Sequence, residues 1–249
     1  MIRIRTFCPV DEEAVCLEYI EGHRMVLEDY GILNVTSYNK DWISNPHAYG
    51  VIAEVDGMLV GGIRVEVADG IHRLPVETAV GKIDPKVFDL VRKHRLNGGT
   101  GELCGLWNSK KVAGQGISVL LVRAAISVIN QLKFRTLLGI CAEYSLPMFS
   151  RVGFIIDTSL GDHGNFEYPT SEYQANVVGI LNAENLSTST PFDRERMLYL
   201  RANPKMLITE TGPKGEIVID YNLLIPHIRP VENREEVENK PNQNRSSNL

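Results

Sequence analysis

The pattern of apolar and polar positions divides the first third of the chain into short elements. Residues alternate over 2–7, which predicts a strand, and apolar residues then recur at helical spacing over 15–30. The runs 48–55 and 58–67 are rich in β-branched residues and are joined by Asp56-Gly57, a strong hairpin signal. This part of the chain is therefore expected to form a strand, a helix and an antiparallel hairpin.

Strands and helices alternate in the middle of the chain, which favours a mixed α/β layer. Residues 69–83 show no period and are predicted to be a connecting loop. A helix is expected from Asp84-Pro85 to about Leu96, followed by a strand at 100–108, a helix at 117–132, a strand at 135–142, a short helix around 147–152 and a strand at 153–157.

The last third of the chain exceeds this α/β core. A strand over 173–181, a helix that begins at Thr190 and a hairpin formed by 205–212 and 216–225 are expected. The segment after Pro226 has too few apolar residues to pack and is predicted to be a flexible tail. We therefore divide the chain into a core (1–160), an extension (161–225) and a tail (226–249).

The stretch from Lys111 to Ser118, KVAGQGIS, lies between a predicted strand and a long apolar helix. Two glycines at this point allow a tight turn, and the first backbone N–H groups of a helix have no partner inside the helix. Those groups and the positive end of the helix dipole favour an anion, most often a phosphate. The alternative is a plain turn that needs glycine only for its backbone conformation.

Composition and charge narrow the function classes. The chain has 249 residues, of which 43% are apolar and 23% charged, and a net charge of −5 with both signs mixed along it. These values are ordinary for a soluble globular protein and do not indicate a nucleic-acid partner. We expect no membrane span, no signal peptide and a cytoplasmic location.

The cysteines and histidines do not form a recognisable metal or redox motif. Cys8, Cys16, Cys104 and Cys141 stand apart from one another and from the six histidines, so no metal site is predicted. The cysteines are expected to be reduced and mostly buried. A cysteine nucleophile remains an alternative, because sequence alone does not show a neighbouring base.

The order of elements, the glycine turn and the later Arg-Val-Gly-Phe at 151–154 resemble the GCN5-related N-acetyltransferase (GNAT) superfamily over residues 1–160. The resemblance implies a mixed α/β acyltransferase fold, here with a C-terminal α/β extension. It also implies a coenzyme A pyrophosphate held by Arg/Gln-x-x-Gly-x-Gly/Ala, with Lys111 at the first position. The donor-binding residues so implied are Leu106, Trp107, Asn108, Lys111, Val112, Ala113, Gly114, Gln115, Gly116 and Ile117.

Four further segments are similar to acyl-homoserine lactone synthases and N-acyl amino acid synthases: GHRMVLEDYGI, VGGIRV, LPVE and ELCGLW. The resemblance implies transfer of a long acyl chain, commonly from acyl carrier protein, to an amino acid or its derivative. Those enzymes carry an arginine where Arg24 stands and Glu-x-Ser-Arg on the fourth strand. Here that strand keeps Glu102 but has Gly105 at the arginine position.

Acyl transfer from a thioester to an amine needs a base, donors for the carbonyl oxygen and a proton for the leaving thiolate. We predict Glu102 as the base, with a pKa raised by partial burial, although a solvated carboxylate at the strand edge is equally compatible with the sequence. Many GNAT acetyltransferases have a tyrosine acid where Phe149 stands, so Tyr144 is the candidate substitute, or else a packing residue.

Two arginines are candidates to bind a substrate carboxylate. Arg24 and Arg64 each carry a guanidinium that binds carboxylates bidentately. The alternative for each is an ordinary surface ion pair, such as Arg24 with Glu28 four residues later.

The first interpretation is a GNAT-fold N-acyltransferase that moves an acyl group from an acyl-CoA or acyl-carrier-protein thioester to a small amine, such as an amino acid. The second is an N-acetyltransferase that uses acetyl-CoA on a small molecule or protein. The third is a non-catalytic binder of acyl-CoA or acyl carrier protein. No metal is expected as a cofactor, and the sequence does not define the oligomeric state.

Overall fold

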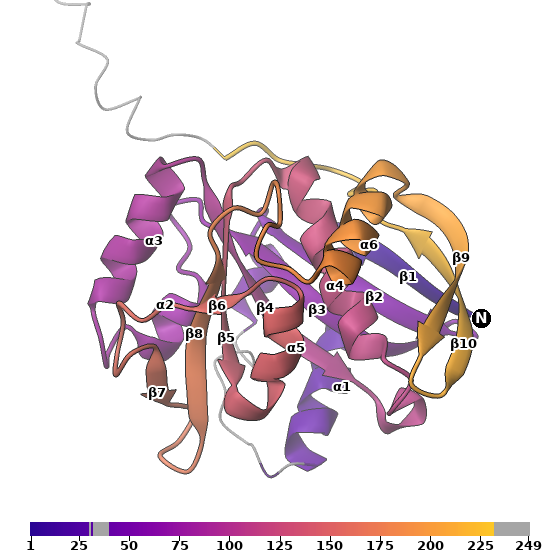
Figure 1. The fold of residues 1–249 in the computed structure, drawn as a ribbon, viewed down its shortest axis with the longest axis horizontal. Helices are drawn as coiled ribbons and strands as arrows, with labels where there is room; N and C mark the ends of the chain where they lie inside the picture. The colour runs from indigo at the N-terminus through magenta and orange to yellow at the C-terminus, as the bar shows by residue number, and fades with distance from the viewer. Residues whose placement is uncertain (30, 32–39, 232–249) are drawn as a thin grey trace, which may run out of the picture.

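The computed structural model describes residues 1–29, 31 and 40–231. Within this part of the chain a ten-stranded mixed sheet runs through the molecule in the order β6-β8-β5-β4-β3-β2-β1-β10-β9, and β7 pairs with β8 (Figure 1). The strands are β1 (Ile2–Phe7), β2 (Ala48–Val55), β3 (Met58–Val67), β4 (Thr100–Asn108), β5 (Thr136–Ala142), β6 (Ile155–Ile156), β7 (Asn165–Glu167), β8 (Gln174–Ile180), β9 (Lys205–Gly212) and β10 (Gly215–Asn222).

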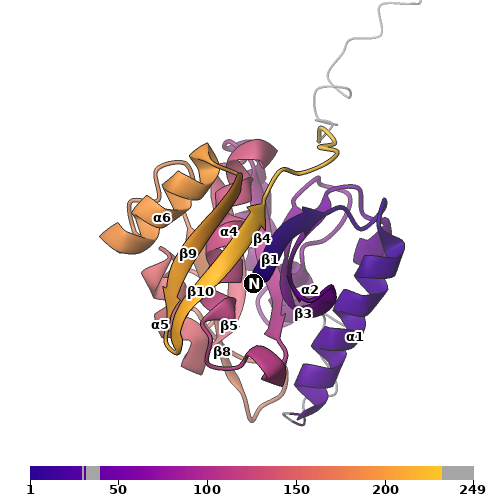
Figure 2. The ribbon, with the colours of Figure 1, turned by 90° about the vertical axis from the view of Figure 1, so that its right-hand side faces the viewer.

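Helices cover both faces of the sheet. They are α1 (Glu13–Asp29), α2 (Pro75–Val80), α3 (Lys86–Leu96), α4 (Ile117–Leu132), α5 (Leu146–Arg151) and α6 (Pro191–Ala202), with short 3-10 turns η2 (Asp41–Ser44), η3 (Lys110–Val112) and η4 (Glu143–Ser145). Figure 2 shows α4, α5 and α6 on one side of the sheet and α1 and α2 on the other. No helix in the described ranges is both long and apolar enough to cross a membrane.

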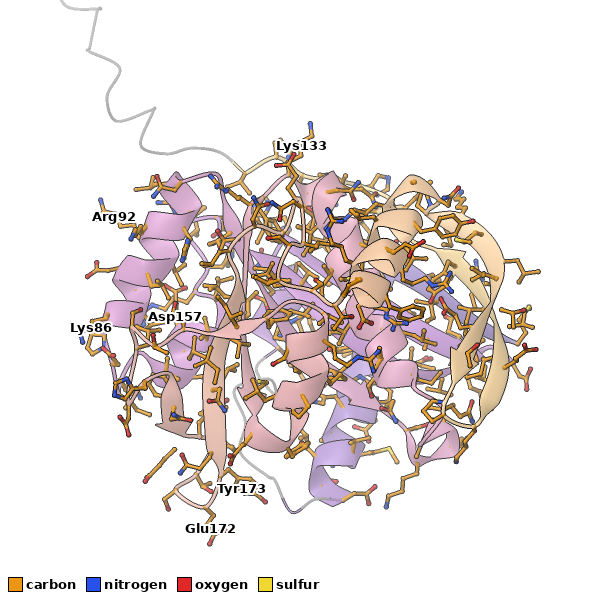
Figure 3. All side chains as sticks on the ribbon, viewed as in Figure 1. Lys86, Arg92, Lys133, Asp157, Glu172 and Tyr173 are labelled. Atoms are coloured by element: carbon orange, nitrogen blue, oxygen red, sulfur yellow. The ribbon has the colours of Figure 1, made fainter. Side chains whose placement is uncertain are left out.

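The face under α4 holds the largest apolar core. Eleven residues of α4 are buried, because α6 packs over the side of the helix that the sheet does not cover. Ser127 and Arg123 are buried in this packing, and Arg123 pairs with the fully buried Asp193 of α6. Charged residues such as Lys86, Arg92, Lys133 and Glu172 point outward at the rim of the molecule (Figure 3).

Two smaller apolar clusters lie on the opposite face, and a polar strip separates them. One cluster joins α1 and η2 to the sheet through Tyr19, Trp42 and Trp107. The other joins α2 and α3 to the sheet around Leu138. Three buried charged side chains that belong to neither cluster form this polar strip: Arg64 and Glu66 on β3 and Glu102 on β4. Charged residues are rarely buried unless they are paired, so the strip is a candidate functional region.

The extension predicted at 161–225 belongs to the same sheet. Strand β8 lies antiparallel beside β5, and β10 adds to the other end of the sheet by parallel pairing with β1. Residues 226–231, part of the predicted tail, follow the sheet without helix or strand, and Arg229 there pairs with Asp11. The rest of the predicted tail, 232–249, lies outside the described residues.

The structure corrects the predicted loop at 69–83, which contains helix α2. Pro75 occupies the first turn, and the Glu77 carboxylate accepts a hydrogen bond from the Leu74 N–H at 2.7 Å, which caps the helix start. The helix is too short for a full period of apolar residues, so its pattern resembles a loop. The strand predicted at 153–157 is reduced to Ile155–Ile156.

Candidate active site

A cleft opens where β4 and β5 separate. The two strands pair in parallel only at Thr100–Glu102 with Thr136–Leu138, and β4 continues to Asn108 without a partner on that side. The cleft has a volume of about 550 Å³. Its lining comes from α1, β4, α5 and the start of α4, and includes Val26, Leu103, Leu106, Met148 and Phe149. An opening of this kind leaves the backbone N–H and C=O groups of a strand free to bind an extended ligand.

A bulge bends β4 at the middle of the cleft. The register with β3 shifts between Gly62 and Arg64, and Gly105 adopts the left-handed conformation with φ +63°. The Tyr19 hydroxyl of α1 donates a short hydrogen bond to the Gly105 carbonyl. A Cβ at position 105 would lie 2.5 Å from the Tyr19 oxygen, so only glycine fits here without a shift of α1.

The glycine turn lies at one end of the cleft, before α4. Gly114 (φ +75°) and Gly116 (φ +83°) both adopt the left-handed conformation that the sequence predicted for the turn. The hairpin β9–β10 reaches this turn, and Lys214 Nζ donates a hydrogen bond to the Ala113 carbonyl at 2.7 Å. Two exposed lysines, Lys111 and Lys214, therefore accompany the N-terminus of α4.

The predicted donor-binding residues fall into three groups. Leu106, Trp107 and Asn108 line the cleft, and Asn108 also accepts a short hydrogen bond from Ser118, the second residue of α4. Ala113, Gly114 and Gly116 form the turn. The remaining residues do not face the cleft: Lys111, Val112 and Gln115 line a neighbouring cavity of about 460 Å³ against β10, and Ile117 is buried in the core.

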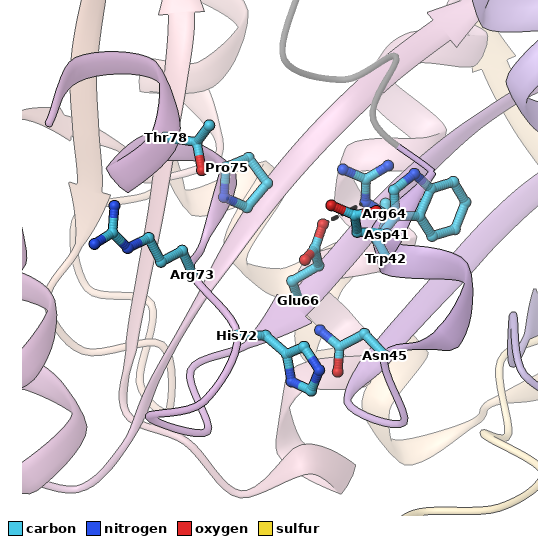
Figure 4. Close-up of a pocket in the computed structure, with 9 residues that line it drawn as sticks. All are labelled: Asp41, Trp42, Asn45, Arg64, Glu66, His72, Arg73, Pro75 and Thr78. Atoms are coloured by element: carbon cyan, nitrogen blue, oxygen red, sulfur yellow. Dashed lines mark ion pairs between the residues drawn. The ribbon is translucent and has the colours of Figure 1, made fainter. Parts of the chain in front are cut away.

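A second cavity of about 290 Å³ lies in the polar strip on the α1 and α2 face. It is lined by Asp41, Trp42, Asn45, Arg64, Glu66, His72, Arg73, Pro75 and Thr78 (Figure 4). Arg64 is 2% exposed, its Nε lies 2.7 Å from Glu66 Oε1, and its guanidinium stacks 4.1 Å from the centre of the Trp42 ring. The Nη1 of Arg64 is buried and has no hydrogen-bond partner among the described residues, so the guanidinium beside this cavity keeps an unsatisfied donor.

Glu102 lines the cleft close to the second cavity. It lies directly opposite Glu66, which lines the second cavity, in the antiparallel β3–β4 pair, and Pro75 lines both spaces. Its Oε2 accepts a hydrogen bond from the Val76 N–H at 2.6 Å, and its Oε1 is buried without a partner. Burial raises the pKa of the Glu102 carboxyl well above its usual range, which favours the protonated acid.

This environment excludes the solvated-carboxylate alternative and agrees with the predicted rise in the pKa of Glu102. A raised pKa favours the protonated carboxyl, whereas a base must be ionised before it accepts a proton. The direction of this shift therefore favours a proton donor at this position over the predicted base.

Three other predicted residues lie in different surroundings. Arg64 lines the second cavity, whereas Arg24 lies on the outer face of α1, where it pairs with Glu21 and Glu28. The predicted carboxylate-binding role of Arg24 is thus not supported by its position, which matches the surface-pair alternative. Tyr144 is 86% exposed at the mouth of the cleft, and Phe149 contributes an apolar wall.

Sequence reasoning missed two residues of the site. His23 lines the cleft next to Tyr19, and burial lowers the pKa of its imidazole to about 4, so it is neutral at pH 7. The signal was the helical spacing of Cys16, Tyr19 and His23, which are the buried residues of α1. Glu66 was not singled out because an acidic residue in a β-rich run resembles a solvated position.

All four cysteines are free thiols. Only Cys104 and Cys141 line the cleft among them, and burial raises the pKa of both. A raised pKa favours the thiol over the nucleophilic thiolate. The geometry therefore does not favour the cysteine-nucleophile alternative.

Comparison with protein-family models and with curated proteins finds no match for this chain. Solved structures do match. FeeM, an N-acyl amino acid synthase from uncultured soil microbes, superposes with a TM-score of 0.60 at 14% identity, covering 76% of this chain and 94% of FeeM. MesI, a CoA-dependent acyl-homoserine lactone synthase, gives 0.52 at 14% identity, covering 80% and 95%.

An acyl-CoA N-acyltransferase from Pseudomonas aeruginosa gives a TM-score of 0.51 at 12% identity, covering 72% of this chain and 99% of that protein. At these identities the similarities establish the fold. The chain has the mixed α/β fold of the GNAT acyltransferases, which confirms the fold that the sequence predicted.

Proposed function

We propose that this protein is an N-acyltransferase that moves an acyl group from a thioester in the cleft to a small amine in the second cavity. The observation that carries this proposal is that the two spaces share Pro75 and that Glu102 of the cleft lies directly opposite Glu66 of the second cavity. A transferase needs two substrates to meet at one point, and a thioester and an amine entering from opposite sides meet here.

The cleft fits an acyl thioester donor. Its lining is mainly apolar side chains and strand backbone, which suits an extended chain with a few amide groups. Asn108 and Ser118 extend the lining to the start of α4, where the turn and its two lysines suit the phosphates of acyl-CoA. The cleft of about 550 Å³ holds the thioester arm and the acyl group together, and we favour a longer acyl chain, carried by CoA or by acyl carrier protein, because the lining is mainly apolar.

The second cavity fits a small amine that also carries a carboxylate, such as an amino acid. Both acidic and basic side chains line it: Asp41 and Glu66 are acidic, and Arg64 and Arg73 are basic. A buried guanidinium with an unpaired N–H favours a carboxylate, and the carboxylates favour an ammonium group. FeeM, one of the solved structures that share this fold, is an N-acyl amino acid synthase.

The chemistry requires no covalent enzyme intermediate. The free amine attacks the thioester carbonyl, and the unpaired backbone N–H groups of β4 beyond the bulge at Gly105 stabilise the developing oxyanion. The apolar walls of the cleft strengthen these hydrogen bonds by excluding water.

Release of free thiol tests the proposal. The purified protein is incubated with acetyl, octanoyl and dodecanoyl thioesters of CoA and with a panel of amino acids and simple amines, and the products are identified by mass spectrometry. We expect thiol release that depends on an added amine, together with the matching amide. Thiol release that is independent of amine, or none with any pair, would contradict transfer.

Two arginine variants test the acceptor assignment. Arg73→Ala should raise the KM for a carboxylate-bearing amine by about tenfold, equivalent to the loss of one charged hydrogen bond, and leave the KM for the donor unchanged. Arg24→Ala, on the outer face of α1, is the matched control and should change neither. An unchanged KM with Arg73→Ala and a raised KM with Arg24→Ala would contradict this assignment and place the acceptor at the outer face of α1.

A further inference from the structure

Two carboxyl groups face each other at the junction of the two cavities, in different environments. Glu66 and Glu102 are directly opposite in the register of β3 and β4, so their Cβ atoms are about 5 Å apart. Glu66 lies against the Arg64 guanidinium at 2.7 Å, whereas no cation among the described residues forms an ion pair with Glu102. Two negative charges this close repel each other, and the Arg64 guanidinium lies against Glu66 rather than against Glu102.

The hydrogen bonds of Glu102 indicate which oxygen carries the proton. Oε2 accepts from the Val76 N–H and is therefore the carbonyl-type oxygen, which leaves the proton on Oε1. Oε1 is completely buried and has no partner among the described residues, and the residue lines the cleft. An unpaired donor in a buried site is costly unless a ligand accepts its hydrogen bond.

We infer that Glu102 is the general acid of the proposed transfer: its Oε1–H protonates the sulfur of the leaving thiol. This role rests on the proposed function, and it reverses the base role that the sequence predicted for the same residue. Phe149, an apolar residue of the cleft wall, has no group that could donate this proton, and Glu102 supplies it instead.

The same Glu102 carboxyl gives one proton and takes up another during the reaction. The amine nitrogen forms a bond to the carbonyl carbon, the C–S bond breaks, and its electron pair goes to sulfur. Sulfur takes the proton from Glu102 Oε1. The resulting Glu102 carboxylate then takes the proton that the new amide nitrogen loses, and the acid form is restored. The amine attacks as the free base, after its bound ammonium group has lost a proton to water.

The charges around Glu102 support its resting protonated state. Burial is the largest effect on the pKa of Glu102 and raises it; Glu66 of β3 and Glu77 of α2 raise it further. The Val76 N–H and Arg64 lower the pKa but do not offset burial. Cys104 on β4 is a neutral thiol. Leu138 on β5, which pairs with Glu102, is apolar.

Leaving groups of different basicity distinguish an acid from a base. The same acyl group is supplied as a thioester of N-acetylcysteamine, whose alkyl thiolate needs a proton, and as a thioester of thiophenol, whose thiolate leaves without one. Glu102→Gln keeps the Val76 hydrogen bond and the shape of the side chain. We expect it to lower kcat at least about 100-fold with the alkyl thioester and less than about tenfold with the aryl thioester.

Controls separate this inference from the proposed function and from misfolding. Glu77→Gln, a nearby carboxyl that caps α2 and does not line the cleft, should affect both donors equally and weakly. Wild-type kcat should fall at high pH as Glu102 ionises, and Glu102→Gln should lack that limb. Equal losses with both thioesters in a folded Glu102→Gln would overturn the acid role.

Rescue of Glu102→Gln by an amine that is already unprotonated would also overturn the acid role of Glu102. An alkoxyamine is unprotonated at neutral pH, so no base has to remove an ammonium proton before it attacks; if it alone restored Glu102→Gln, Glu102 would be the base that activates the amine. Failure of the wild-type protein to transfer any acyl group is the distinct outcome that removes the proposed function itself, and the acid role with it.

Discussion

The guanidinium of Arg64 lies beside Gly105, with Nη1 3.9 Å from the point that a Cβ at position 105 would occupy. The synthases that this chain resembles have an arginine at that position of the strand. Here Tyr19 and the left-handed backbone leave no room for a side chain, and a guanidinium reaches the same place from the neighbouring strand. A positively charged side chain therefore lies beside position 105 although the strand itself has glycine there.

Gly105→Ala tests the close approach of α1 to the bulge. The substitution places a Cβ 2.5 Å from the Tyr19 hydroxyl and imposes a strained φ of +63°, so we expect a loss of about 1–3 kcal/mol in the free energy of unfolding. Urea unfolding measures this loss. Gly57→Ala is the control, because Gly57 has φ +76° but nothing within 4 Å of its Cβ position.

The difference in the free energy of unfolding between Gly105→Ala and Gly57→Ala isolates the contact of residue 105 with Tyr19. In a Tyr19→Phe background, which lacks the hydroxyl, Gly105→Ala should cost less than in the wild-type background. An unchanged cost in the double variant would mean that backbone strain alone accounts for the effect.

Arg64 and Glu66 should be coupled in stability. Arg64→Met leaves a buried, uncompensated carboxylate and should lower the free energy of unfolding by about 3–5 kcal/mol. Arg64→Met combined with Glu66→Leu removes both charges and should recover most of that loss. The double variant should still fail to use carboxylate-bearing amines. A double variant as unstable as the single one would contradict the pairing.

His23 should make stability depend on pH. Its pKa falls from 6.5 to about 4 in the folded protein because of burial, so between these values the unfolded chain binds a proton that the folded protein does not. The free energy of unfolding should therefore decrease as the pH falls from about 6.5 to about 4, by up to about 3 kcal/mol. His23→Phe should lack this component. Parallel pH profiles for the two proteins would show that His23 does not contribute.

The two lysines at the glycine turn should act only on donors that carry phosphates. Lys111→Ala combined with Lys214→Ala should raise the KM for acyl-CoA by about tenfold or more and leave that for the N-acetylcysteamine thioester unchanged. The effect should shrink as the salt concentration rises. Lys82→Ala with Lys86→Ala, remote from the turn, is the charge-matched control. An equal change with both donors would argue against phosphate binding at the turn.

The elements that form the site could be predicted from local patterns. The strand at 100–108, the glycine turn and the helix after it carry strong signals because their apolar periods and glycines are close in sequence. The start of α2 could not be predicted in the same way, although Pro75 and Glu77 are typical of a helix start. Its stability comes from packing against β4 and from the Val76 hydrogen bond to Glu102.

The roles of individual side chains were less predictable than the fold. Arg24 and His23 are adjacent in sequence but about 100° apart around α1, so a shift of one residue decides which of them faces the cleft. The state of Glu102 depends on Glu66 and Val76, both distant in sequence. Strand registration and packing determine such contacts, and a single sequence carries no direct signal for them.

Binding of CoA to the turn and the cleft tests the central claim most directly. Thermal unfolding is followed with CoA, acetyl-CoA and a long-chain acyl-CoA for wild type, Lys111→Ala, Gly114→Val and, as a control for the left-handed glycine, Gly57→Val. We predict stabilisation of the wild type, about 2.7 kcal/mol at a ligand concentration 100 times Kd, a larger shift with the long chain, and no shift for Gly114→Val. A folded wild-type protein that none of the three ligands stabilises would contradict a CoA donor and leave only an acyl-carrier-protein thioester. A Gly114→Val variant stabilised as strongly as the wild type would contradict phosphate binding at the turn.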